Sequence, residues 1–136
     1  HLCSHLYKEA TTLPWVEMMR DMTLYKYCDI YMLLNDADRA CTEHLFNRAE
    51  EVGMEKICAF AVLQTSELLM FNNFYAIEIA TKILGSDNDF LHMIVSPKEK
   101  KKFLFTERNI LERFFSENRK TLLKEVKYIE NTEYGT

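Results

Sequence analysis

Cysteine and histidine are the residues in this chain whose side chains could act as nucleophiles, bases or metal ligands. The four cysteines are Cys3, Cys28, Cys41 and Cys58, and the four histidines are His1, His5, His44 and His92. Nucleophilic catalysis requires a cysteine and a histidine that meet in space together with a third, orienting group. The spacing of these residues does not indicate such a meeting, for either His44 or His92. We therefore expect no catalytic residues and do not predict an enzyme.

Two short groups of residues have a spacing that metal ligands could use. His1, Cys3 and His5 alternate along the chain, and Cys41 and His44 share one face of an expected helix. Zinc needs four converging ligands, and the sequence has no CxxC pair and no matched second pair. Three scattered glycines also cannot form a phosphate-binding loop. The prediction is that the chain holds no metal and no cofactor.

The main electrostatic feature is a basic segment that begins at residue 98. From there to the end the chain has ten Lys and Arg against seven Asp and Glu, whereas the preceding part has seven against fourteen. The total net charge is only −4, so any electrostatic function must be local. The candidate contacts for phosphates or an acidic partner are Lys98, Lys100, Lys101, Lys102 and Arg108, with Phe103 and Phe105 beside them. The alternative, which we favour, is that the charges form a solvated helix face and the phenylalanines are core.

Tyrosine and methionine are concentrated in the first quarter of the chain. Tyr27 and Tyr31 are one helical turn apart and share a face, so they are candidate partner contacts. Tyrosine and methionine are common at adaptable protein surfaces, but they also fill irregular cores, which is the interpretation we favour. The residues concerned are Trp15, Tyr25, Tyr27, Tyr31, Met18, Met19, Met22 and Met32.

Capping residues and apolar periodicity predict a chain made of helices. Ser96-Pro97-Lys98-Glu99 is a capping box with proline at the first helical position, so a helix should begin at Pro97. Ser96 could also accept a proline-directed phosphate, but its capping role already explains the motif. Gly53 and Gly85 follow apolar runs, as left-handed helix ends do. The expected helices cover about 14–34, 37–52, 54–70, 73–84, 87–95, 97–105 and 107–130, with Thr23 or Asn118 as breaks in the longest two.

Two of these helices differ in their apolar pattern. The segment 57–63 is apolar on every face, which predicts a central helix enclosed by others. By contrast, Leu122, Leu123, Val126 and Ile129 form one stripe with charged residues opposite, which predicts a peripheral helix.

The segment 55–84 resembles one helix-turn-helix unit of a tetratricopeptide-type alpha-solenoid. Phe60 and Leu63 stand where such a unit keeps large apolar residues, and Ala76 follows the turn at Asn72-Asn73. Gln64 and Ala80 depart from that pattern, and no second copy follows at a fixed period. The resemblance implies a stack of helical hairpins and, by analogy, a peptide-binding role.

We expect an all-α fold: a compact stack of about six to eight helices, as an irregular bundle or short alpha-solenoid. Residues 1–136 should form a single domain, which could be a fragment of a larger protein. The predicted function is a non-enzymatic protein–protein interaction module, such as a scaffold or adaptor, that presents a helical surface to another protein. The alternative is a nucleic-acid-associated domain that uses the basic 98–127 segment. Because the cysteines lie in apolar helical contexts, we expect reduced thiols and an intracellular location, cytoplasmic or nuclear, with no membrane partner.

Overall fold

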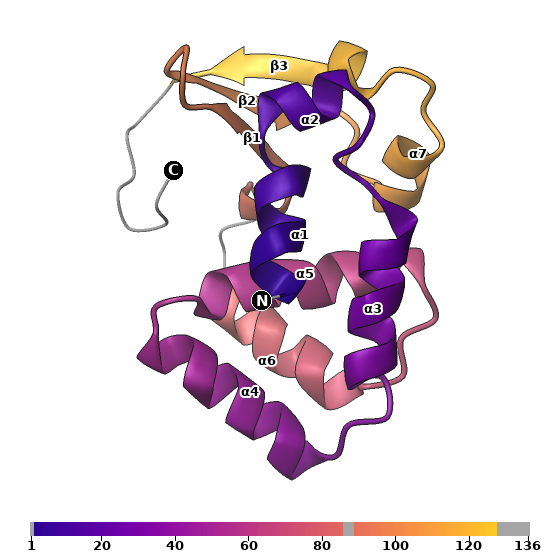
Figure 1. Cartoon of the computed structure of the whole chain (residues 1–136), viewed down its shortest axis with the longest axis vertical. Coiled ribbons are helices and arrows are strands. Elements are labelled where there is room, and N and C mark those ends of the chain that lie inside the picture. The colour runs from indigo at the N-terminus through magenta and orange to yellow at the C-terminus, as the bar shows by residue number, and fades with distance from the viewer. Residues whose placement is uncertain (1, 86–88, 128–136) are drawn as a thin grey trace.

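The fold consists of a helical body with a small antiparallel sheet at one end, in a computed structural model that describes residues 2–85 and 89–127 (Figure 1). Helix α4 lies at the opposite end of the body from the sheet. The helices within the described residues are α1 (Leu2–Ala10), α2 (Leu13–Glu17), α3 (Leu24–Leu34), α4 (Arg39–Glu51), α5 (Glu55–Leu68), α6 (Phe74–Leu84) and α7 (Ile110–Phe114). The strands are β1 (Met93–Ser96), β2 (Lys101–Phe105) and β3 (Leu123–Val126), and two short 3₁₀ helices, η1 (Phe90–His92) and η2 (Arg119–Leu122), precede β1 and β3.

The expectation of an all-α fold is wrong, because the three strands form an antiparallel sheet in the order β1-β2-β3. The expected helix 97–105 is replaced by a hairpin turn and β2. Ser96, expected to cap that helix, instead ends β1 and pairs with Lys101. Lys100 takes a left-handed φ of 52°, which turns the chain back onto β1. A motif that fits a helix start therefore serves as a hairpin connection.

The expected helix 107–130 is also largely wrong. Among its described residues, 107–127, only Ile110–Phe114 is α-helical, and Leu122, Leu123 and Val126 belong to η2 and β3. Ile129 lies outside the described residues. The segment 87–95 becomes η1 and the start of β1 where it is described.

The helix predictions for the middle of the chain are confirmed, with ends that differ by one to two residues. The expected helices at 37–52, 54–70 and 73–84 correspond to α4, α5 and α6. The expected helix 14–34 is divided into α2 and α3, and Thr23 is the residue before α3, where a break was expected. Gly53 and Gly85 both have positive φ, of 72° and 56°, as left-handed helix ends require. A cap at Ser86 lies outside the described residues.

Helix α5 is the centre of the helical body, as the apolar pattern predicted. Every residue from Ile57 to Val62 is buried. Ala59 and Ala61 on α5 and Ala76 and Ala80 on α6 are all fully enclosed. These small side chains let α5 and α6 approach closely as an antiparallel hairpin. The chain continues after this hairpin into η1 and the sheet.

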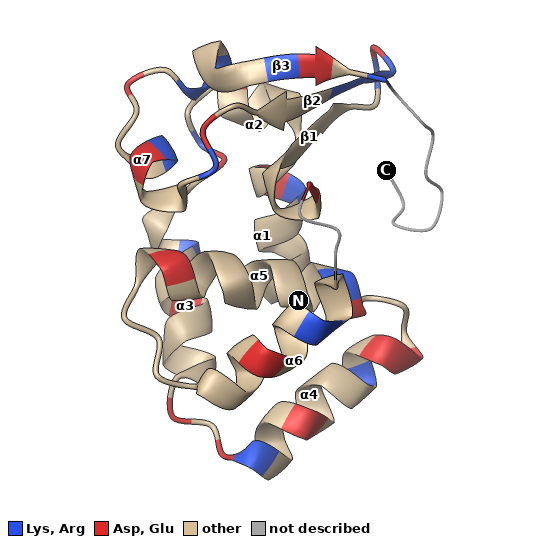
Figure 2. Ribbon diagram, turned by 180° about the vertical axis from the view of Figure 1, so that it is seen from behind, with Lys and Arg blue, Asp and Glu red and all other residues tan. Residues whose placement is uncertain are grey.

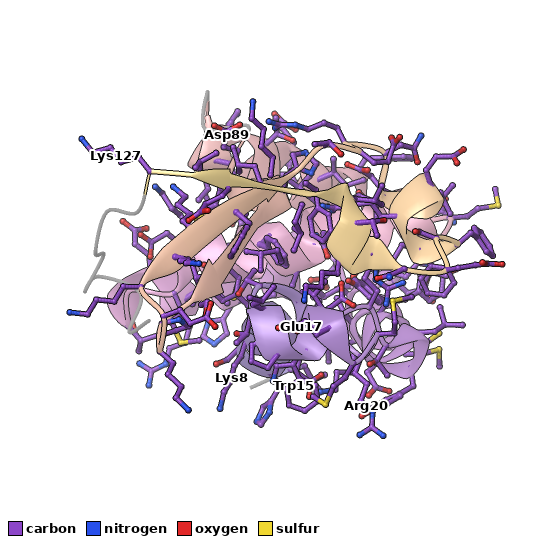
Figure 3. The ribbon with its side chains drawn as sticks, turned by 90° about the horizontal axis from the view of Figure 1, so that it is seen from above. Lys8, Trp15, Glu17, Arg20, Asp89 and Lys127 are labelled. Carbon is purple, nitrogen blue, oxygen red and sulfur yellow. The ribbon has the colours of Figure 1, made fainter. Side chains whose placement is uncertain are left out.

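The sheet rests on α2 through a second, smaller apolar cluster. Leu13 and Val16 of α2 pack against Ile94 of β1 and Phe105 of β2. The backbone N–H of Val95 donates to the carbonyl oxygen of Thr11 at 2.7 Å, which ties β1 to the segment between α1 and α2. Seen from above, α2 lies beside the sheet, and Trp15 and Arg20 are on its side away from the strands (Figure 3). The start of the chain therefore holds the sheet in position.

Within the described ranges, none of the helices combines the length and the apolar character that crossing a bilayer requires.

Candidate functional site

The surface of the helical body has an apolar groove between α3 and α4, floored by α1 and α5. Its deeper part has a volume of about 280 Å³, and a shallower part of about 450 Å³ continues it toward the start of α4. The two parts share Leu33, Leu34 and Leu45, and we call them together the α3–α4 groove. The deeper part is lined by Leu2, Cys3, Ile30, Leu33, Leu34, Leu45, Arg48, Ala49, Val52, Met54 and Cys58, and the shallower part adds Asp36, Ala37 and Cys41.

Large apolar side chains around this groove are exposed to solvent. Leu33 is 60% exposed, Val52 53% and Leu2 40%. Met32, next to Leu33 on α3, is 79% exposed. Exposed apolar residues that adjoin one another around a hollow are typical of interaction sites, whereas scattered ones need no explanation.

The groove follows from a stripe on α4 that faces α3. Cys41, Leu45, Arg48 and Val52 are spaced by four, three and four residues, so they share one helical face. The neighbouring stripe, with Thr42, Phe46 and Ala49, is buried in the body of the protein, and Ala49 also borders the groove. Asp38 begins α4 by accepting a hydrogen bond from the backbone N–H of Cys41 at 2.8 Å. Helix α4 thus has a second, partly apolar face beside its buried one, of which Leu45 is partly buried against the core and Cys41, Arg48 and Val52 are exposed.

The charges at the groove are few and lie at different places along it. Arg48 is the charged side chain in the lining of the deeper part, where it also pairs with Glu51 at 2.9 Å. Asp36 lines the shallower part. The groove therefore presents a cation near its middle and an anion at one end.

The structure separates the two tyrosines that the sequence placed on one face. Tyr27 is fully buried, and its hydroxyl donates a hydrogen bond of 2.7 Å to Oε1 of Gln64 on α5. Burial and the nearby Asp21 carboxylate raise the pKa of this phenol. Tyr31 is partly buried, with its ring edge against Phe71. Tyr27 has no surface to offer a partner, and the exposed residues of the methionine and tyrosine set are instead Tyr25, Met18 and Met32.

The predicted basic residues gather at one end of the sheet. Lys98, Lys100 and Lys101 are exposed in and beside the β1–β2 turn, and Lys102 is partly exposed on β2. The register of the sheet pairs Lys102 with Val126, so Lys127, which follows Val126, lies at the same end, whereas Lys124 pairs with Leu104 toward the other end of β2. Figure 2 shows basic residues at this turn. We call Lys98, Lys100, Lys101, Lys102 and Lys127 the lysine end. Arg108 is not part of the lysine end and forms an ion pair with Asp89, at 2.9 Å.

The lysine end differs from the helix face that the sequence predicted. Its lysines project from a turn, from β2 and from the residue after β3, and Lys127 lies at the outer edge of the sheet (Figure 3). Phe105 is buried in the cluster under the sheet and Phe103 packs against that cluster, so both are core residues. None of these five lysines forms an ion pair within the described ranges.

The histidines and cysteines are not brought together into the constellation that catalysis would need. His44 is exposed on α4, and His92 is buried in η1. Neither histidine lines the two hollows that contain Cys3, Cys58 and Cys41. Over the described ranges, no group of three or more His, Cys, Asp or Glu side chains is placed to hold a metal ion.

A buried charged cluster lies between the sheet end and the helices. Arg119 of η2 donates from Nε to both carboxylate oxygens of Asp21, at 2.9 and 3.0 Å. Arg113 of α7 is 1% exposed and lies over the ring of Phe105, 4.2 Å from its centre. Burial lowers the pKa of Arg113 to about 10. Asp21 and Arg119 join the segment before α3 to the segment before β3, so we assign this cluster a structural role.

Sequence reasoning missed the α3–α4 groove, although a signal for it was present. The stripe Cys41, Leu45, Arg48 and Val52 is visible in the sequence as a second apolar row on a helix that already has one. The sequence alone does not determine which of two such rows is covered by other helices.

Comparison of the chain with protein-family models, with curated proteins and with solved structures finds no match.

Proposed function

We propose that this protein is a non-enzymatic interaction module whose α3–α4 groove takes the apolar face of a helix from a partner protein. The observation that carries the proposal is the continuous apolar hollow between α3 and α4, lined by the exposed Leu33 and Val52. Apolar surface of this kind gains free energy when another apolar surface covers it, at roughly 25 cal/mol per Å². Helix-in-groove docking is the recognition mode that fits a hollow between two helices.

The charges of the groove narrow the choice of partner helix. Its apolar side chains should recur at i, i+3 or i+4, and i+7, to enter the hollow along its length. An acidic residue among them would meet Arg48, and a basic residue at one end would meet Asp36. Such charges fix the direction and register of the helix more than they add affinity.

The proposal is tested with helical peptides of that pattern. A displayed library of amphipathic helices is selected against the whole chain, and the affinity of the selected peptides is measured by fluorescence polarisation. Leu33→Glu and Leu45→Glu place a charge in the shared part of the groove and should each weaken binding by about tenfold or more. A photo-crosslinker at position 33 should attach to the same peptides.

Met70→Glu is the matched control, because Met70 is 88% exposed and lies outside the groove. This variant should bind the peptides as the original chain does. The proposal fails if the groove variants remain folded by circular dichroism and bind as tightly as the control. It also fails if reversing the charge at Arg48 leaves the preference for acidic peptides unchanged.

The lysine end supports a second candidate function, contact with a nucleic acid. Five lysines at one end of the sheet, without ion pairs in the described part of the chain, form a local cation cluster that phosphates could neutralise. Replacing Lys100, Lys101 and Lys102 by glutamate should then abolish retention on a polyanion column while the fold is preserved. Binding that does not weaken between about 50 and 200 mM salt would exclude this candidate.

We further propose that the protein acts inside the cell, in the cytoplasm or the nucleus. The support for this is that all four cysteines are free thiols, as in the reducing compartments of a cell.

A further inference from the structure

Two cysteines from helices far apart in the sequence meet at the α1 end of the groove. Cys3 is on the first turns of α1, and Cys58 is on α5. Both line the deeper part of the α3–α4 groove, and Cys3 packs against the core cluster that contains Cys58, so the thiols lie close enough to shift each other's pKa. Cys3 is partly exposed, whereas Cys58 is 6% exposed. The hollow therefore gives a small molecule a route to a pair of adjacent thiols.

The contact between the thiols makes them chemically unequal. The interaction between the two thiols lowers the pKa of Cys58 and raises that of Cys3. Burial and the carboxylate of Glu55, which precedes Cys58 by less than one helical turn, oppose the lowering. A thiolate is the reactive form of cysteine, so Cys58 is the better nucleophile of the pair.

The other two cysteines have neither this contact nor this position. Cys41 is exposed at the start of α4, where interaction with Asp38 raises its pKa. Cys28 is partly buried on α3 and lines neither part of the groove. The chain thus contains its own control thiols, one of them more accessible to solvent than the pair.

We propose that Cys3 and Cys58 form a dithiol site for hydroperoxides, in which Cys58 attacks the peroxide and Cys3 resolves the product as a disulfide. The Cys58 sulfur takes one oxygen from hydrogen peroxide, the O–O bond breaks, and one water leaves with formation of a sulfenic acid. The Cys3 sulfur then attacks the sulfenic sulfur, the S–O bond breaks, and a second water leaves. Two thiols are oxidised and one peroxide is reduced, and a cellular thiol can reverse the reaction by exchange.

Oxidation would join α1 to α5 by a covalent bond at the floor of the groove. The two helices already pack against each other, so the disulfide would form between neighbouring elements of the fold. The reaction depends on the pair itself and not on whether the groove binds a partner.

The test uses the whole chain and hydrogen peroxide at near-neutral pH, with blocked thiols mapped by mass spectrometry after digestion. We expect a peptide pair joined through Cys3 and Cys58, lighter by two hydrogens than the sum of the free peptides. It should form at a peroxide concentration about tenfold lower than the one that oxidises Cys41. Oxidation of the exposed Cys41 before the pair, or separate oxidation of Cys3 and Cys58 without a crosslink, would overturn the proposal.

Two variants separate the roles of the thiols. In Cys3→Ser the sulfenic acid at Cys58 has no resolving thiol, so dimedone should trap it there. In Cys58→Ser the remaining thiol at Cys3 should be no more reactive than Cys28. The assignment of attacking and resolving thiols is wrong if dimedone labels Cys3 in Cys58→Ser as fast as it labels Cys58 in Cys3→Ser. Crosslink mapping on the unmodified chain tests the dithiol site even where a variant does not fold.

Discussion

Two buried arginines near the sheet differ in how their guanidinium groups are satisfied. Arg119 donates to both oxygens of Asp21 and has 4% of its side chain exposed. Arg113 is equally enclosed, but its Nε and Nη1 atoms have no hydrogen-bond partner among the described residues. Removing one partner of a buried ion pair lowers the stability of the fold strongly, because the other charge is left buried and unpaired. A buried cation whose N–H groups lack hydrogen bonds instead carries a desolvation cost of its own. The two arginines should therefore respond in opposite ways to the same substitution.

We predict that Arg119→Met lowers the free energy of unfolding by about 3 kcal/mol, because it strands the buried carboxylate of Asp21. Arg113→Met should change it by less than about 1 kcal/mol, or raise it, because methionine keeps the contact with Phe105 and removes an unbonded charge. Urea denaturation of the two variants measures both values. Equal losses in the two variants would contradict this account of the cluster.

A buried histidine should make stability depend on pH. His92 is 8% exposed, and burial together with the charges of Arg113 and Arg108 lowers its pKa from 6.5 to about 4. The unfolded chain therefore takes up the proton first as the pH falls, and the folded state loses stability. Between pH 7 and pH 4 the uptake of this proton by the unfolded chain should lower the free energy of unfolding by up to about 3 kcal/mol. The loss is complete only below the pKa of His92 in the folded state.

The measurement for His92 is the free energy of unfolding across that range, compared with His92→Gln and His44→Gln. The glutamine at position 92 cannot take up a proton, so this variant should lack part of the decline. His44 is exposed on α4 and serves as the control, and its variant should follow the original curve. The prediction is wrong if the His92 variant declines as steeply as the original chain.

At the scale of the elements, one substitution distinguishes the observed hairpin from the helix that the sequence indicates. Lys100 has a φ of 52°, which is strained for a residue with a Cβ atom. Lys100→Gly should therefore stabilise the protein by about 0.5–1 kcal/mol, whereas glycine in a helix would cost about 1 kcal/mol. The sign of the change in thermal denaturation decides between the two, and Lys98→Gly in the same turn is the control. A loss of stability in the Lys100 variant would argue for a helix.

The sequence was sufficient for α4, α5 and α6 because their signals are local. A helix closes its hydrogen bonds within itself, so capping residues, apolar periodicity and glycine ends fall inside one continuous stretch. The run of buried residues from Ile57 to Val62 and the left-handed Gly53 and Gly85 were readable for this reason.

The strands were not readable because their partners are not local. Strands β1, β2 and β3 have only four, five and four residues, too few for alternation to stand out from a helical pattern. Their hydrogen bonds join β2 to β3 across the segment that contains α7 and η2. A capping box at Ser96 then gave a stronger local signal than the strands themselves, although tertiary pairing decided the outcome.

The same limit applies to the candidate sites. The lysines could be named from the sequence, but their gathering at one end of the sheet depends on the register of β2 and β3. Tyr27 and Tyr31 were correctly expected to favour the interior, where Tyr27 is enclosed and Tyr31 partly so. The meeting of Cys3 with Cys58 depends on the packing of α1 against α5, which no local pattern records.

At the scale of the whole molecule, the protein has a large helical core and a much smaller cluster under the sheet. The cluster under the sheet has four buried members, Leu13, Val16, Ile94 and Phe105, whereas the helical core is centred on the enclosed α5. The sheet is held by this cluster, by the bond from Val95 to Thr11 and by the pair of Asp21 with Arg119. Because fewer apolar contacts protect it, the sheet should open without unfolding the helices.

Native-state hydrogen exchange tests this division of stability. Amides of β2 should exchange through an opening of lower free energy than amides of α5. Val16→Ala removes apolar contact only under the sheet, so it should lower the protection of β2 by about 1–2 kcal/mol and leave that of α5 nearly unchanged. Val62→Ala, in the fully buried centre of α5, should lower both together, since the sheet cannot remain formed when the helical core opens. A Val16 variant in which α5 loses as much protection as β2 would mean that sheet and helices unfold as one cooperative unit.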